Sequence, residues 1–305
     1  MDNRQRKFVC AILLVVGSIS IGLASPLQLV YAHSFSGSES ASFLSLVHKI
    51  RVESELVLDN AGNATLAQQH AENAAKAIDN QTIDEIAERN NRIADDLSSL
   101  LQDLQTAAAS TPIDAASIND IVSNLDATLG EAVSVRIDQE QLNNSTTQAI
   151  VLADVIDEVL RNYGSAFQVG FDMTNMSLMD EMVQDNNSGR GDSGDMEGGG
   201  STQTEGNTST STVVNMSAYQ SAQAFANKSL EIFQNDLKPL SPPPSATAGD
   251  NNSSNLTATI SQIEGSLVKL QQAINNKASP EEIIMIVHAE IHPNIQIAYK
   301  LQLLP

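Results

Sequence analysis

Cysteine and tryptophan are nearly absent from this sequence. Its 305 residues include one cysteine, Cys10, and no tryptophan, and aromatic residues make up 4%. Cys10 lies in a segment that we expect to be removed, so the mature chain has no thiol for a disulfide or a thiolate metal site. Its stability must therefore come from an aliphatic core, for which hydrophobic residues at 41% are sufficient.

Basic residues are also few. The chain has 16 Lys and Arg against 37 Asp and Glu, a formal net charge of −21. Such a surface repels phosphate, and no basic patch is visible, so nucleic acid and anionic membranes are not expected as partners. Metal ions and cationic surfaces are the partners that the acidic charge favours instead. The alternative interpretation is that the acidic charge only keeps the protein soluble.

The N-terminus has the three parts of a secretory signal. Arg4, Arg6 and Lys7 precede an apolar run from Phe8 to Ala24, and Val30-Tyr31-Ala32 supplies small residues for cleavage. We predict a signal peptide over 1–32 and a secreted or cell-surface protein. An uncleaved membrane anchor is the alternative, because the apolar run approaches the length that spans a bilayer. Frequent Asn-X-Ser and Asn-X-Thr sequences predict a glycosylated surface.

Apolar residues recur at spacings of three and four along the mature sequence, which predicts an all-α fold. Five such stripes predict an antiparallel helical bundle over 33–164. The clearest stripe runs from Ile83 to Leu104; Thr82 and Glu85 form a capping box before it, and Asn90 in its seam is expected to fix the helix register. Gly164 is expected to cap the fifth helix at its C-terminus.

The remaining sequence divides by composition. Residues 165–183 predict a methionine-bearing helix or turn, and 184–212, rich in Gly, Ser, Asn and Asp, predict a flexible, disordered linker. Residues 213–305 predict a C-terminal segment of three helices, of which the last begins at Ser279-Pro280-Glu281-Glu282 with a capping box and a proline in the first turn. Periodicity leaves open whether these helices form their own bundle or complete the first one.

The last helix carries Met285, His288 and His292 along one edge of its apolar face. Two histidines four residues apart can chelate one ion, and a thioether adds a soft ligand. This pattern predicts a copper site, with zinc as a possible alternative metal. Pro293 is expected to kink or end the helix after His292. The competing interpretation is a pair of histidines without a metal.

Met173, Met176, Met179 and Met182 are spaced three apart. A helical core stripe alternates three and four, whereas a constant step of three rotates off the face, so packing explains the run poorly. The run resembles the methionine-rich segments of extracytoplasmic copper-handling proteins, a resemblance that implies Cu(I) binding and no particular fold. The competing interpretation is an adaptable apolar helix.

Cleavage after Ala32 makes His33 the N-terminal residue. Its α-amine and imidazole then resemble the histidine brace of copper oxygenases and some periplasmic copper binders, although those families are β-rich and this chain is not. His48 and His70 are expected to be a surface and a semi-buried histidine without metal.

Motifs of hydrolases, zinc proteases and nucleotide-binding enzymes are absent from the sequence, so we expect no catalytic activity. The sequence predicts a secreted acidic helical protein that binds a soft or borderline metal, above all copper, for storage, buffering or delivery. The alternative is a non-catalytic cell-envelope or scaffold protein that binds another protein through its helices.

Overall fold

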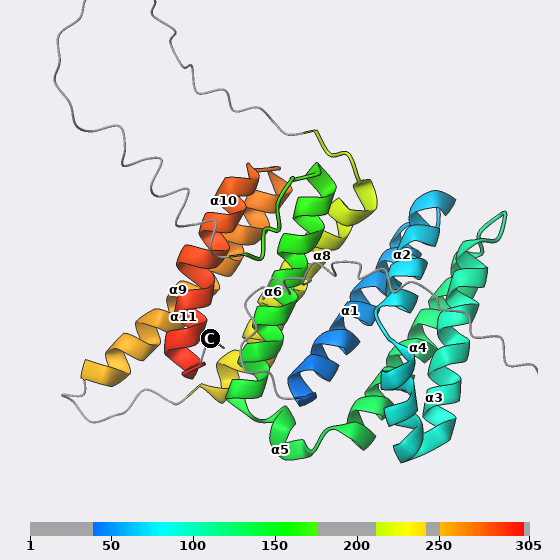
Figure 1. Cartoon of the computed structure of the whole chain (residues 1–305), viewed down its shortest axis with the longest axis horizontal. Coiled ribbons are helices and arrows are strands. Elements are labelled where there is room, and N and C mark those ends of the chain that lie inside the picture. The colour runs from blue at the N-terminus through cyan, green and yellow to red at the C-terminus, as the bar shows by residue number, and fades with distance from the viewer. Residues whose placement is uncertain (1–38, 176–211, 242–250, 302–305) are drawn as a thin grey trace, which may run out of the picture. The chain divides into compact units, whose positions relative to one another are not determined.

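The computed structural model describes residues 39–175, 212–241 and 251–301, and all regular structure in these ranges is helical (Figure 1). The predicted all-α class is confirmed. The signal peptide, His33, Met176, Met179, Met182 and all of the predicted linker except Thr212 lie outside the described residues. Within the described ranges, no helix has the length and apolarity that crossing a membrane requires.

Six helices precede the undescribed residues 176–211. They are α1 (Glu39–Asp59), α2 (Ala64–Lys76), α3 (Asn80–Ala108), α4 (Ala115–Arg136), the short α5 (Gln139–Leu142) and α6 (Ser145–Phe167). Four α-helices follow: α8 (Met216–Ile232), α9 (Asn251–Asn275), α10 (Pro280–Met285) and α11 (His292–Tyr299). Two π-helical turns, η1 (Phe233–Leu237) and η3 (Ile286–Ile291), and one 3₁₀ turn, η2 (Lys238–Leu240), complete the described elements.

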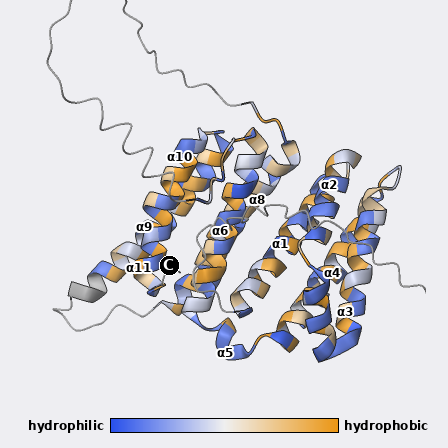
Figure 2. Cartoon of the chain, in the orientation of Figure 1, coloured by the Kyte–Doolittle hydropathy of each residue, from blue (hydrophilic) through white to orange (hydrophobic). Residues whose placement is uncertain are grey.

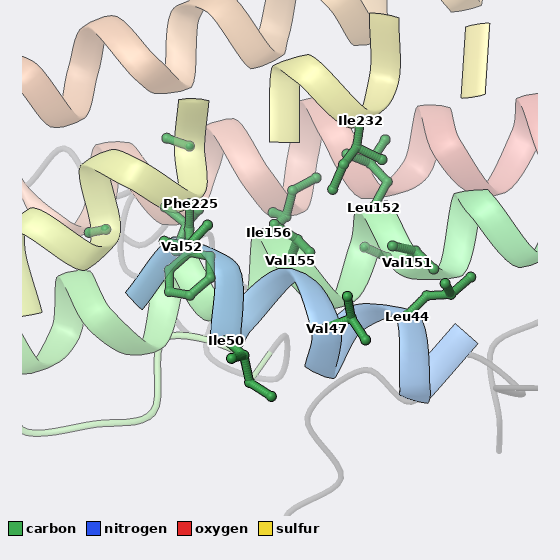
Figure 3. Close-up of a cluster of buried hydrophobic side chains, with 14 of the residues drawn as sticks. Leu44, Val47, Ile50, Val52, Val151, Leu152, Val155, Ile156, Phe225 and Ile232 are labelled. Carbon is green, nitrogen blue, oxygen red and sulfur yellow. The ribbon is translucent and has the colours of Figure 1, made fainter. Parts of the chain in front are cut away.

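The helix α6 is the central element of the core. It packs against α1, α8 and α11, and its consecutive residues 150–153 are all buried. Figure 2 shows apolar residues along α6, in contrast to the hydrophilic α5. In Figure 3, Val151, Leu152, Val155 and Ile156 of α6 lie among apolar side chains of α1 and α8. A helix that is apolar on several faces must be covered on several faces. The helices before and after residues 176–211 therefore share one core.

Helix ends differ in detail from the sequence prediction. Asp79, not Thr82, caps α3, and its carboxylate accepts the backbone N–H of Thr82 at 2.8 Å. The helix α6 continues past Gly164 to Phe167, and Gln168, which has the left-handed conformation (φ 51°), caps it. Asn90 interrupts α3 with non-helical backbone angles (φ −160°, ψ 100°) where we expected an unbroken seam.

Both π-helical turns lie just before a proline. The N–H of Lys238, before Pro239, bonds to the carbonyl of Phe233, and the N–H of His292, before Pro293, bonds to that of Val287. A proline has no N–H and crowds the carbonyl four residues earlier, and a widened turn accommodates both effects. Thus Pro293 does not end the helix: α11 continues to Tyr299. The predicted start of the last helix is confirmed, since Ser279 caps α10 and Pro280 follows it.

Candidate metal site

The predicted ligands of the last helix lie in different environments. His288 and His292 are buried, with 2% and 3% of their surface exposed, whereas Met285 is 43% exposed. Met173 is also buried and lies in the turn that follows α6. The structure therefore brings the two histidines and Met173 into the core and leaves Met285 at the surface.

His288 is held by the backbone of that turn. Its Nε2 lies 2.9 Å from the carbonyl oxygen of Met173. A carbonyl can only accept, so Nε2 carries the hydrogen and Nδ1 carries the lone pair. Burial lowers the pKa of His288, against the opposing effects of the Met173 hydrogen bond and the Asp172 charge. The ring is consequently neutral at neutral pH, which is the form that binds metals.

His292 and Asp157 lie next to His288. The two imidazole rings are edge to face, with centroids 5.4 Å apart, and Nε2 of His292 is 3.9 Å from Oδ1 of Asp157 on α6. Burial raises the pKa of Asp157 to about 8, although Arg161 partly opposes this shift. Two imidazoles and one carboxyl thus face one another across the contact between α6 and the continuous last helix, which comprises α10, η3 and α11.

Asp157 was not among the predicted site residues, although the sequence carried a signal for it. Ile150, Ala153 and Leu160 are buried on the same face of α6, and Asp157 interrupts this apolar stripe. An acidic residue at such a position is costly to bury unless something compensates its charge. Only the fold shows that the last helix places two histidines beside it.

The turn after α6 is fixed at two points. A Cβ on Gly164 would lie 3.3 Å from Sδ of Met173, so the glycine allows the thioether to pack directly on α6. Asp172 Oδ1 accepts both the N–H of Thr174 at 2.9 Å and its hydroxyl at 2.7 Å. These contacts hold the Met173 carbonyl in position for His288.

The distances between His288, His292 and Asp157 show that the side chains are neighbours but do not form a complete coordination sphere. In the described part of the chain, no three His, Cys, Asp or Glu side chains are already arranged to hold a metal ion. An ion between α6 and the last helix would require the His292 and Asp157 side chains to move closer together than 3.9 Å.

A second buried polar cluster contains Glu53, His70 and Ser221. Its residue types are those of a catalytic triad, but its hydrogen bonds are not. Ser221 donates to Oε1 of Glu53 at 2.7 Å, and His70 contacts Oε2 of the same carboxylate at 2.8 Å. In a catalytic triad the histidine, not the acid, receives the serine proton. This cluster does not activate Ser221.

His48 lies on α1 and is partly buried rather than on the surface as expected. Burial lowers its pKa to about 3, with further lowering by Lys228 and Arg51. His70 is fully buried, with hydrogen-bonding partners at both ring nitrogens.

Comparison with known proteins adds no assignment. No protein-family model, no curated protein and no solved structure matches this chain.

Proposed function

We propose that the protein binds one copper ion between α6 and the last helix, through His288, His292 and Asp157, for storage, buffering or delivery outside the cytoplasm. The observation that carries the proposal is the pairing of two buried histidines with a buried carboxyl, at 5.4 Å between ring centroids and 3.9 Å from nitrogen to oxygen. This set replaces Met285 of the sequence prediction by Asp157.

The second support is the hydrogen bond from His288 to the Met173 carbonyl. Metal-binding histidines generally donate their other ring N–H to a carbonyl or carboxylate, which fixes the ring and leaves one nitrogen for the ion. Here the ring is fixed through Nε2 and lies inside the core. On binding, the ion would displace the proton of the buried Asp157 carboxyl, and the resulting carboxylate would supply the negative charge that a cation needs in an apolar environment.

Copper is preferred over zinc because a site of nitrogen and oxygen donors generally binds Cu²⁺ more tightly than Zn²⁺. Two imidazoles and one carboxyl, completed by a water, also form zinc sites, so zinc is the competing ion in the test. Copper binds imidazole well, and the predicted mature chain, which lacks Cys10, has no thiol, as suits a compartment where thiols are oxidised. The methionine run and His33 remain predicted additional copper ligands.

The proposal is tested by titrating the chain from residue 33 onward with Cu(I), Cu(II) and Zn(II) against competing chelators. A His33→Ala background removes the N-terminal chelate from the measurement. We expect one copper ion to bind far more tightly than an acidic surface would bind it. His288→Gln and His292→Gln should each weaken binding roughly a hundredfold, and Asp157→Asn about tenfold.

Met285→Leu is the matched control, because Met285 lies on the same helix but is exposed. It should leave the affinity unchanged. Circular dichroism of each variant checks that helicity is kept. Binding that is equally tight in His288→Gln and His292→Gln would contradict the site, and the absence of tight binding would contradict the function and favour the protein-binding alternative.

A further inference from the structure

A network of buried and partly buried polar side chains joins α8 to α1 and α2. Glu53 comes from α1 and Asn60 from the turn that follows it, His70 and Asn73 from α2, and Gln220 and Ser221 from α8. His70 is at its centre: Nδ1 lies 2.8 Å from Oε2 of Glu53, and Nε2 lies 3.0 Å from Oε1 of Gln220. Its ring is fully buried. The network is separate from the proposed copper site.

The direction of each hydrogen bond on the Gln220 side follows from one backbone carbonyl. Leu56 O can only accept, so the group of Asn60 that lies 2.8 Å from it is Nδ2, and Oδ1 points the other way. Oδ1 of Asn60 then accepts Nε2 of Gln220 at 3.1 Å. Gln220 therefore presents its oxygen to His70, and Nε2 of His70 must donate.

On the other side, Glu53 is surrounded by donors. Oε1 accepts the Ser221 hydroxyl at 2.7 Å, and Oε2 accepts Nδ2 of Asn73 at 3.2 Å. An oxygen that already accepts an amide N–H is best satisfied as part of a charged carboxylate, with Nδ1 of His70 as another donor. Both nitrogens of His70 then carry hydrogens.

We infer that His70 is a buried imidazolium paired with the Glu53 carboxylate at neutral pH, and that this pair is a proton-dependent joint holding α8 against α1 and α2. If the proton is lost, one ring nitrogen becomes an acceptor facing the oxygen of either Glu53 or Gln220. Two acceptors in contact away from water repel each other and lose a hydrogen bond. Since Gln220 and Ser221 belong to α8, that helix loses its polar contacts.

The neighbouring charges are consistent with this protonation state. Beside Glu53, a surface cleft is lined by Lys49 of α1, Lys76 of α2, and Glu158 and Arg161 of α6. Glu158 pairs with Lys49 at 3.1 Å and with Arg161 at 2.9 Å, and Lys76 pairs with Glu72 at 3.0 Å. The cations are therefore largely compensated by their own partners, and α8 contributes the neutral Gln220 and Ser221 to the network.

Nitrogen-15 NMR of the histidine rings in the full-length mature chain tests the protonation state directly. At pH 7.5, His70 should show two protonated ring nitrogens with similar shifts. His48 is the internal reference, because it is expected to show one protonated and one unprotonated nitrogen. An unprotonated Nδ1 on His70 would mean a neutral pair with protonated Glu53 and would overturn the inference.

Hydrogen exchange tests the joint. Between pH 7 and pH 10, the protection factors of α8 amides should fall about tenfold relative to those of α3 and α4. In His70→Gln, which cannot carry the charge, this difference should disappear, while His48→Gln should retain it. An equal fall in all helices of the wild-type protein would overturn the joint, and the NMR result stands even if His70→Gln does not fold.

Discussion

Gly164 shows how one missing side chain fixes a neighbouring turn. Its position near the end of an apolar stripe predicted a helix cap, but α6 continues beyond it. A Cβ there would meet Sδ and Cγ of Met173 at 3.3 and 3.4 Å. Sequence periodicity reports only on the helix that contains a glycine. The close contact that requires a glycine here is made by Met173, nine residues later in the chain, whose side chain packs on the helix.

At this scale we expect alanine to have different effects at two helical glycines. Gly130 in α4 has open space around its missing Cβ, so Gly130→Ala should raise the free energy of unfolding by roughly 0.5–1 kcal/mol. Gly164→Ala gains the same helix propensity but pushes on the buried Met173, so it should stabilise less or destabilise. Urea denaturation measures both. Equal stabilisation by the two variants would contradict the prediction, because it would show that the Met173 side chain moves away from the new Cβ at no cost.

The candidate site was only partly predictable from single residues. The four-residue spacing of His288 and His292 correctly placed both side chains on one buried edge of the helix. Which residues share an edge depends only on the local geometry of the helix. Met285 was assigned to the same edge by assuming about 100° per residue throughout. The π-helical turn η3 begins at Ile286 and advances by a smaller angle, so Met285 is exposed. Asp157 depends on packing between distant segments, which local pattern cannot show.

At the scale of elements, the helices of four turns or more were predictable, because each buries a stripe long enough to show its period. The helix α5 was missed because Gln139–Leu142 is too short for periodicity. The two π-helical turns were missed because proline rules predict an end or a kink rather than a widened turn. Helix starts were recognised as polar, but the residue chosen as cap was sometimes wrong, as at Asp79.

Two neighbouring helix starts give a matched test of capping. The Asn144 side chain accepts the N–H groups of Thr146 at 2.9 Å and Thr147 at 3.3 Å, whereas Asp138 makes no side-chain cap bond to α5. Asn144→Ala should lower the free energy of unfolding by about 1 kcal/mol. Asp138→Ala should change it by much less. Thermal and urea unfolding of protein from a host without glycosylation compares them, and an equal loss in both variants would contradict the assignment.

At the scale of the whole molecule, the buried ionisable groups predict how stability depends on pH. Native Asp157 keeps its proton up to about pH 8, whereas its ordinary pKa is 3.8. Unfolding therefore releases a proton between these values, and raising the pH favours the unfolded state. Below about pH 6.5, His48 acts in the opposite direction, since the unfolded chain protonates it and the native state, with a pKa of about 3, does not.

We therefore expect the metal-free protein to lose stability as the pH rises from 6.5 to 8. The dependence should flatten near pH 6.5, where the unfolded chain begins to protonate His48 and His288 and so opposes Asp157. Asp157→Asn should reduce the slope between pH 6.5 and 8 by up to about 1.4 kcal/mol per pH unit. Asp103→Asn, an exposed position on α3, should keep the wild-type slope. Urea unfolding in the presence of a chelator measures the slopes, and identical slopes in all three proteins would contradict the prediction.

The network around His70 also sets an order for folding. Gln220 follows His70 by 150 residues, and Ser221 follows Glu53 by 168. During synthesis, α1 and α2 therefore emerge long before α8 exists, with the polar side chains of Glu53 and His70 still in water on the surface that α8 will cover. Such long sequence separations delay folding. The first helices of the chain can complete their native contacts only after most of the protein has been made.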